Sequence, residues 1–585
     1  MIFKILLLTS FLISQSNMVF NFESKYGNGT NINDLNLQEV NYSYFENLLD
    51  INYNYKNIFF YTQLEYSNSP IYGIDRYKIN SLPNTYYIEL SDSQYLFKFG
   101  HIQTLYGYGL ATNMFQDHNT DFDNRVKGAE LKYMPLDEVE LFAISGTGNY
   151  GIKSRADARY NALNFKYDYD LFGVQYFTEI GDFLASFGTN KTKFKAGILN
   201  DYSINQPFLS SDTRLSVELQ EFQLDTGFSE FSSIANEDTF VELNSLNIGY
   251  SNTLSIFDIY YEKSINTYNK ILRKAQNQNG YNEYLSLSTN LFGFDILYEF
   301  KDYNMPYYFP ITSNPPTVFM ESSSVLLSRN LHAINFSDEI GHQFEARVDL
   351  NDISFIFNIS MGMKHYGIQY TEFSQDNGLV NGTYSKVNWN DVLKMNFLNE
   401  DLVAHKPFRD YYAEMNGWSR NNSLYYKFGL SSQYSYDNVS AKNYQTITIP
   451  TQFVYRLKNN NSVTIYYENQ KIDNLNSSVD WESYYIRQKY SNEYLSLSYN
   501  INKFASFTYF LDKEIKSFYD ANSEEMPGRK NNKWTGYEIN FELSSSAQLS
   551  IFQGSQKGGL VCANGICAVQ PSFEDGIKVT YRTIF

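Results

Sequence analysis

The residues that could carry out chemistry are few and scattered. The six histidines occupy positions without a common spacing: His101, His118, His332, His342, His365 and His405. The chain has no Gly-x-Ser-x-Gly nucleophile elbow and no His-Glu-x-x-His pair, the patterns that indicate a serine hydrolase or a zinc protease. We therefore expect no enzymatic activity and no cofactor.

An acidic segment supplies the candidates for cation binding. Asp117, Asp121 and Asp123 follow one another closely, and carboxylates are the ligands that a hard cation such as calcium prefers. Their spacing matches no recognised calcium-binding loop, which favours solvation of a loop. The prediction is no metal site, with cation binding left as the alternative.

The two cysteines bracket a turn signal near the end of the chain. Cys562 and Cys567 flank Ala-Asn-Gly-Ile, and Asn-Gly is typical of a two-residue hairpin turn. In an exported protein such a pair is most simply a disulfide. No histidine or further cysteine lies near to complete a metal site, so we expect a structural crosslink in a loop.

The elements that must position these residues are short alternating strands. In one example Phe294, Ile296, Tyr298 and Phe300 alternate with Asp295, Leu297, Glu299 and Lys301, the period of a strand with two different faces. Aromatic residues make up 18% of the chain, which suits strands and the interfacial girdles of membrane barrels. About 26 strands (range 24–28) of eight to eleven residues would fill the chain. A large soluble sandwich would share this pattern.

The beginning of the sequence indicates export. Lys4 supplies a positive charge, Ile5 to Ile13 is apolar, and Ser14-Gln15-Ser16 offers small residues for cleavage, as in a signal peptide. We predict a signal peptide over 1–16 and a single domain, an antiparallel outer-membrane β-barrel, over 17–585. No later segment reads as a transmembrane helix, and mean hydropathy is −0.42. The net charge of −18 argues against nucleic acid as a partner.

The last eight residues are typical of the closing strand of a Gram-negative outer-membrane barrel. Val579, Tyr581, Thr583 and Phe585 alternate with Lys578, Thr580, Arg582 and Ile584. Lipid would contact the first set, and a polar lumen the second. We predict that Tyr581 and Phe585 form the assembly signal, and that this strand pairs with the strand near Val19.

Two stretches interrupt the strand pattern, near 303–341 and near 363–405. The first contains four prolines, which are excluded from central strands, so we expect long loops that stand outside or fold into the lumen. A polar cluster there could tie a loop to the barrel wall. Its candidate members are Glu321, Arg329, His332 and Glu339.

Four stretches together resemble an uncharacterised family (a domain of unknown function) of large Gram-negative outer-membrane β-barrel proteins. They are Tyr44–Asn47; Tyr106-Gly-Tyr-Gly-Leu110 with Asp121-Phe-Asp-Asn-Arg125-Val-Lys-Gly128; Asn314–Thr317 with Glu321 to Glu345; and Gly558 to Phe573 with the final strand. The resemblance implies a barrel of unknown role. Tyr108 stands where the family tends to have a basic residue, which puts a role for positive charge there in doubt.

The sequence leaves two functions open. The first is a pore or transport channel for small neutral or cationic solutes, which an acidic, aromatic-rich chain would suit. The second is a structural, assembly or partner-binding envelope barrel with loops filling the lumen. Either would reside in the cell outer membrane, with membrane lipid and the barrel assembly machinery as partners and an envelope protein as a further candidate. The solute and the oligomeric state are not indicated.

Overall fold

The fold comes from a computed structural model of the whole chain. It describes residues 17–32, 39–68, 78–79, 84–118, 122–149, 151–152, 166–194, 239–270, 279–305, 312–320, 324–329, 338–374, 378–387, 389–393, 405, 407–437, 442–475, 487–519, 530–563, 566–570 and 572–585. The predicted signal peptide, 1–16, lies outside these residues. Among them, no helix is both long and apolar enough to cross a membrane.

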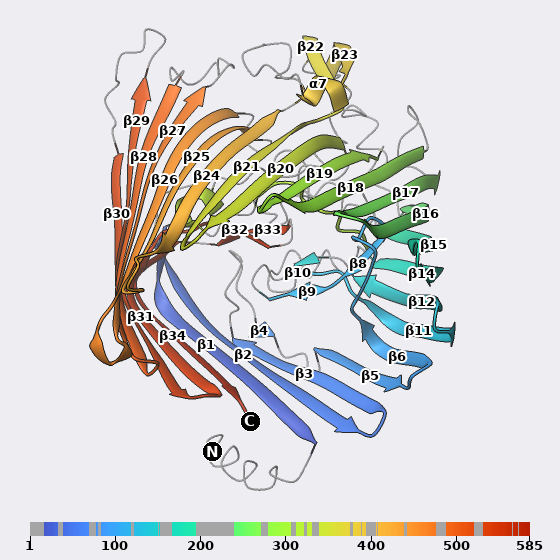
Figure 1. The fold of residues 1–585 in the computed structure, drawn as a ribbon, viewed down its shortest axis with the longest axis horizontal. Coiled ribbons are helices and arrows are strands. Elements are labelled where there is room, and N and C mark those ends of the chain that lie inside the picture. Colours follow the sequence, from blue (N-terminus) through green and yellow to red (C-terminus); the bar gives the residue numbers. More distant parts are fainter. Residues whose placement is uncertain are drawn as a thin grey trace.

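In the described part of the chain, 24 antiparallel strands form one closed barrel (Figure 1). The strands, in chain order, are β1 (Met18–Ile32), β2 (Glu39–Tyr55), β3 (Ile58–Asn68), β5 (Thr85–Ser91), β6 (Tyr95–Ile102), β11 (Val126–Leu136), β12 (Val139–Asn149), β14 (Lys166–Thr178), β15 (Gly181–Phe194), β16 (Thr239–Leu254), β17 (Phe257–Lys270), β18 (Asn279–Leu291), β19 (Phe294–Asn304), β20 (Asp338–Leu350), β21 (Ile353–Met363), β24 (Phe408–Trp418), β25 (Leu424–Asp437), β26 (Lys442–Arg456), β27 (Ser462–Leu475), β28 (Arg487–Ile501), β29 (Ala505–Tyr519), β30 (Lys530–Ser544), β31 (Ala547–Gln556) and β34 (Phe573–Ile584).

The predicted fold class is confirmed, with a strand count at the lower end of the predicted range. Of the 24 barrel strands, 15 are longer than the predicted eight to eleven residues; β1 has 15 residues and β2 has 17. Longer strands use more of the chain each, so fewer of them close the barrel. The closing pair is β34 with β1, with Tyr581 opposite Ser24, as predicted. The Phe585 ring stacks on Phe20, with ring centroids 5.5 Å apart.

Strand alternation separates an apolar outward face from a polar inward face. On β26, Ile447 and Ile449 are exposed, whereas Thr446 and Thr448 between them are buried. On β27 the exposed Tyr467 adjoins Glu468, which is fully buried. Successive side chains of a strand point to opposite faces, here toward lipid and toward the lumen. The buried polar positions of each strand therefore belong to its lumen face.

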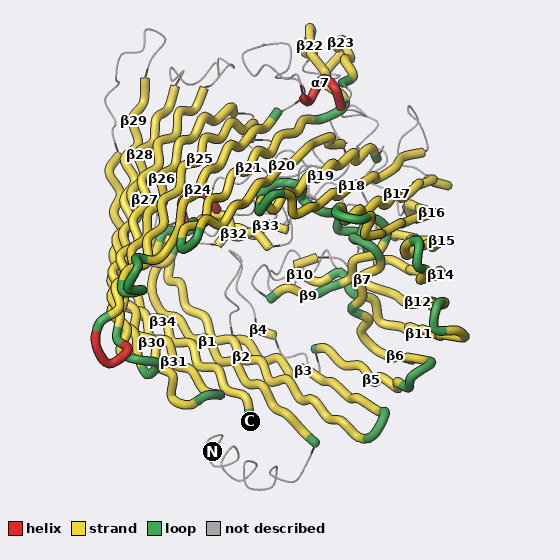
Figure 2. Tube along the Cα trace, in the orientation of Figure 1, coloured by secondary structure: helices red, strands yellow, loops and turns green. Residues whose placement is uncertain are grey.

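The two ends of the barrel differ in their connections (Figure 2). One end has tight turns, such as Lys56 and Asn57 between β2 and β3, where Lys56 has φ 53°. The other end has the long connections, 103–125, 305–337, 364–407 and 557–572. These hold the small elements β7 (Thr104–Tyr106), β8 (Thr112–Met114), β9 (Gln116–Asp117), β10 (Phe122–Asp123), α6 (Val325–Ser328), β22 (Tyr366–Ser374), β23 (Gly378–Lys386), α7 (Trp389–Leu393), β32 (Gly559–Ala563) and β33 (Ile566–Gln570). Figure 1 shows β9, β10, β32 and β33 within the ring of barrel strands.

Candidate functional site in the barrel interior

The connection 103–125 enters the lumen and is held there by a buried glutamate. Glu262, on the inward face of β17, accepts a hydrogen bond from the Tyr108 backbone N–H at 2.6 Å and another from the Tyr260 hydroxyl at 2.6 Å. Gly107 has φ 63°, and a Cβ there would lie 2.4 Å from Glu262 Oε2. The position therefore needs glycine both for its backbone angle and for this approach.

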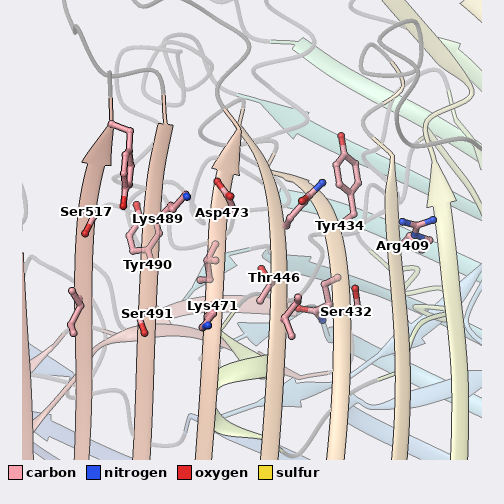
Figure 3. Close-up of a pocket in the computed structure, with 16 residues that line it drawn as sticks. Arg409, Ser432, Tyr434, Thr446, Lys471, Asp473, Lys489, Tyr490, Ser491 and Ser517 are labelled. Atoms are coloured by element: carbon pink, nitrogen blue, oxygen red, sulfur yellow. The ribbon is translucent and has the colours of Figure 1, made fainter. Parts of the chain in front are cut away.

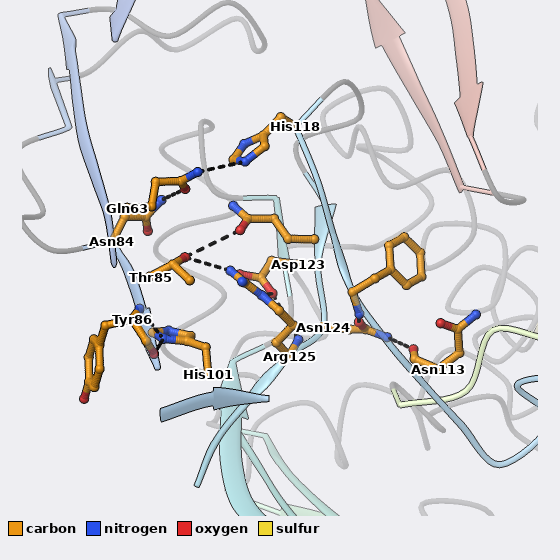
Figure 4. A network of polar contacts seen from close by, with 12 residues as sticks. Gln63, Asn84, Thr85, Tyr86, His101, Asn113, His118, Asp123, Asn124 and Arg125 are labelled. Carbon is orange, nitrogen blue, oxygen red and sulfur yellow. Dashed lines mark hydrogen bonds and ion pairs between the residues drawn. The ribbon is translucent and has the colours of Figure 1, made fainter. Parts of the chain in front are cut away.

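The same connection is fastened to the wall by Asp123 and Arg125 (Figure 4). Arg125 Nε and Nη2 donate to the two carboxylate oxygens of Asp123 at 2.9 and 3.0 Å, and Nη2 also donates to Thr85 Oγ1 on β5 at 2.9 Å. A bidentate guanidinium–carboxylate pair is among the strong polar contacts. The carboxylate of Asp123 is thus occupied by Arg125. In the part of the chain that the structure describes, no cluster of three or more His, Cys, Asp or Glu residues could hold a metal ion, and Asp121 lies outside that part.

The connection 103–125 is joined to the proline-rich connection 305–337 through backbone hydrogen bonds. Asn113 N donates to Thr312 O at 2.6 Å, and Asn314 N donates to Gly109 O at 3.0 Å. Gly109 has φ 85°, and a Cβ there would lie 2.8 Å from Asn314 O. Gly109 thus permits the contact between the two connections, and Gly107 permits the contact with Glu262 on the wall.

The proline-rich connection is held on one side by β19. Lys301, fully buried on the lumen face, donates to Thr317 O at 2.6 Å and forms an ion pair with Glu339 on β20 at 2.6 Å. The Tyr303 hydroxyl donates to Pro316 O at 2.6 Å. These bonds satisfy carbonyl groups of 312–320, described residues that belong to no β-strand.

Six strands further around the barrel, the same connection contacts the wall again through α6. Glu468 on β27 accepts from the Val325 and Leu326 backbone N–H groups at 2.7 Å each, and Gln470 donates to Leu326 O at 2.9 Å. Arg329 Nη2, just after α6, forms an ion pair with Asp512 on β29 at 2.6 Å. Glu468 thereby satisfies the N–H groups that the first turn of a helix leaves without intrahelical partners.

The connection therefore crosses the lumen, because Lys301, Glu468 and Asp512 all face inward. Beside α6 a chamber of about 380 Å³ remains, lined by inward residues of β28 to β31 and β34, among them Tyr494, Phe510 and Phe552. The hairpin β32–β33 of the connection 557–572 also contacts α6. Its register places Cys562 opposite Cys567. The disulfide stays a prediction, because only the backbone is described there.

Of the predicted polar cluster, the structure describes Arg329 and Glu339, and these two lie apart. Arg329 contacts Asp512 on β29, whereas Glu339 contacts Lys301 on β19. Glu321 and His332 lie outside the described residues. The sequence analysis did not identify Glu262 and Glu468, the main residues that hold the connections. Each is one polar position in an alternating strand. Tyr108, the partner of Glu262, is 154 residues away, and Val325, a partner of Glu468, is 143 residues away.

A fourth connection, 364–407, packs on the outward face of the wall. Val387 and Val392 of this connection form a buried cluster with Ile340 on β20 and Met363 on β21. Figure 1 shows β22, β23 and α7 above the barrel strands. Ile340 and the exposed Phe344 are four residues apart on β20, so both side chains lie on the outward face of the strand. The cluster therefore covers the outside of the barrel.

His365 fastens this outer cover. It contacts Asp302 through Nε2 and Asp338 through Nδ1, both at 3.0 Å. Burial by itself lowers the pKa of His365, but hydrogen bonds and charge from the two aspartates outweigh burial and raise the pKa to about 9. His365 is therefore an imidazolium at neutral pH, held between two carboxylates.

Fold and interior together define a large β-barrel whose lumen is crossed by its own connections. The chain belongs to the family described as "Family of unknown function (DUF6029)", whose model matches residues 2–585. A search of curated proteins found no match.

Among solved structures, the chain is similar to the P pilus usher (PapC) translocation pore, with TM-score 0.41 and 9% identity over 97% of this chain and 99% of that one. It is also similar to a mutant form of the ferric enterobactin receptor PfeA of Pseudomonas aeruginosa, with TM-score 0.40 and 8% identity over 97% and 80%. The siderophore receptor PirA of Acinetobacter baumannii matches with TM-score 0.39 and 7% identity over 97% and 80%. These similarities assign no function to this chain.

Proposed function

We propose that this protein is an outer-membrane channel for small neutral or cationic solutes, closed in this conformation by its own connections and opened when α6 leaves β27 and β29. Cleavage of a signal peptide near residue 16 and insertion by the barrel assembly machinery belong to the same proposal. The observation that carries it is the attachment of α6 to Glu468 and Asp512. Two wall carboxylates hold one short segment, so a small movement would release it.

The charge of the interior supports a preference for cations. In the described residues, eight buried carboxylates accompany only two buried lysine or arginine side chains. The carboxylates are Glu65, Asp123, Glu130, Glu262, Glu339, Glu414, Glu468 and Asp512, and the bases are Arg125 and Lys301. Rings of carboxylates favour cations in channels, and the proposal includes no catalytic activity.

Planar bilayers test the channel. Purified barrel should give little conductance, whereas a variant in which Gly-Ser residues replace 312–329 should give large conductance with a reversal potential shifted toward cations. If that variant folds, as shown by heat-modifiable migration in gels, and still gives no ion or sugar flux at high protein load, the channel proposal is wrong.

A partner-binding barrel is the second candidate, because a filled lumen also suits a protein that anchors another envelope component. The outer cover formed by 364–407 would then be an interface. Crosslinking and pulldown should recover the same partner from the wild type and lose it when 366–393 is deleted. Unchanged partners after this deletion and after replacement of 312–329 would remove the support for this alternative.

A further inference from the structure

Basic side chains gather on the outward face of the wall, toward the end that has the long connections. Arg409 on β24, Lys471 on β27 and Lys489 on β28 line a groove with a volume of about 810 Å³ (Figure 3). Lys471 is four residues from the exposed Tyr467 on β27, so the two side chains lie on the same face of the strand. Arg409 and the exposed Tyr411 share a face of β24 in the same way. Their side chains therefore belong to the outward face of the barrel.

The groove is positively charged in a protein of net charge −18. Among its lining residues Asp473 is the one acid, against the three bases. Strand register places Asp473 opposite Lys489, and Lys471 opposite Ser491 in the adjacent row. Lys489 Nζ lies 4.8 Å from the centroid of the Tyr519 ring, a cation–π contact that leaves the ammonium able to bind an anion.

The position of the groove matches the headgroup region of a membrane. On β27 the outward residues Val463, Ile465 and Tyr467 are apolar or aromatic, and Lys471 follows four residues beyond Tyr467. Four strand residues span about 13 Å, which is roughly 10 Å of height at the usual tilt of a barrel strand. Headgroup layers occupy about 5–7 Å on each side of the hydrocarbon core, and a lysine stem can reach down to that level.

The width of the groove selects the size of the headgroup. Four strand spacings separate β24 from β28, which amounts to about 19 Å. One phosphodiester is too small to contact bases at both ends, whereas a sugar headgroup with two phosphates can. The apolar side chains of Ile447 and Ile515 also line the groove, and they continue into the apolar band where acyl chains would lie.

We propose that this groove binds a phosphorylated glycolipid of the outer leaflet, with Lys471 and Lys489 on one phosphate and Arg409 toward the other. The inference depends on the outer-membrane location proposed above, and it does not depend on channel opening. The long-connection end then faces outward, as in outer-membrane barrels generally.

Native mass spectrometry of the full-length, delipidated barrel tests the site, with diphosphorylated lipid A as the probe. Each lysine neutralised near an anionic headgroup should weaken binding about fivefold, so K471Q/K489Q should bind about 25-fold more weakly than the wild type. The matched control is K127Q/K263Q, which neutralises two outward lysines on β11 and β17. The control should bind within twofold of the wild type.

Three results would overturn the proposal. They are equal affinity of K471Q/K489Q and wild type, equal loss in the control, and equal affinity of the wild type for phosphatidylglycerol and lipid A. Inorganic phosphate should compete only at millimolar concentration, and competition at micromolar concentration would indicate a soluble-anion site instead. The conductance of K471Q/K489Q, measured separately, should equal that of the wild type, so failure of the lipid site and failure of the channel are distinguishable.

Discussion

The attachment of α6 to Glu468 predicts that a single neutral substitution opens the barrel. Glu468→Gln keeps the shape of the side chain but leaves one carbonyl acceptor for the two backbone donors of Val325 and Leu326. Hydrogen bonds to a charged group contribute about 1.5–3 kcal/mol, against about 1 kcal/mol for neutral ones. The substitution should therefore weaken the closed state by about 1–3 kcal/mol, which increases the ratio of open to closed barrels about 5- to 150-fold.

Single-channel recording in planar bilayers measures this ratio as open probability. Asp512→Asn, which removes the ion pair with Arg329, should act in the same direction, and the double variant should open more than either single one. Glu283→Gln is the control, because Glu283 pairs with Lys263 on the outward face. Wild-type open probability in a folded double variant would refute the reasoning that these carboxylates keep the barrel closed.

Three further predictions concern other attachments. Gly107→Ala should detach 103–125, since its Cβ would collide with Glu262, and it should accelerate proteolysis within that connection while Gly293→Ala, which meets nothing within 4 Å, does not. The raised pKa of His365, about 9, means that its contribution to holding the outer cover is complete below its unfolded pKa near 6.5 and is lost as pH rises through 9. Protection factors for amide hydrogen exchange in 366–393, which correct for the base catalysis of exchange itself, should fall between pH 8 and 10, and His365→Gln should abolish that fall. Non-reducing peptide mapping should find Cys562 and Cys567 in one crosslinked peptide, and free thiols at both would contradict the sequence prediction.

The barrel itself could be predicted because its determinants are local. Alternation assigned Phe294 and Phe300 to one face and Lys301 to the other, and the structure places Lys301 in the lumen. The closing pair followed from the termini for the same reason. The predicted length was too short for 15 of the 24 barrel strands, because hydrophobic alternation marks the part of a strand that faces lipid, while hydrogen-bonded pairing continues beyond it into polar sequence.

The contents of the lumen could not be predicted in the same way. An inward glutamate gives the same sequence pattern whether its carboxylate contacts water or a helix N-terminus. For Glu468, the contact that forms depends on a segment 143 residues away. The glycines at 107 and 109 belong to a stretch that carries the family resemblance, and both have positive φ in the structure. Their partners, Glu262 and Asn314, were not recognisable, because sequence spacing contains no information about contacts across the barrel interior.

Closure and selectivity are linked through the same side chains. In the closed state Glu262, Glu468 and Asp512 are neutralised or hydrogen-bonded by groups of the connections, so the interior tolerates their burial. Release of α6 would leave Glu468 and Asp512 facing water as unpaired anions on the wall. The movement that opens the barrel would thus also expose the charges that attract cations, and an opened variant that lacks both carboxylates should conduct with less preference for cations than one opened by replacement of 312–329.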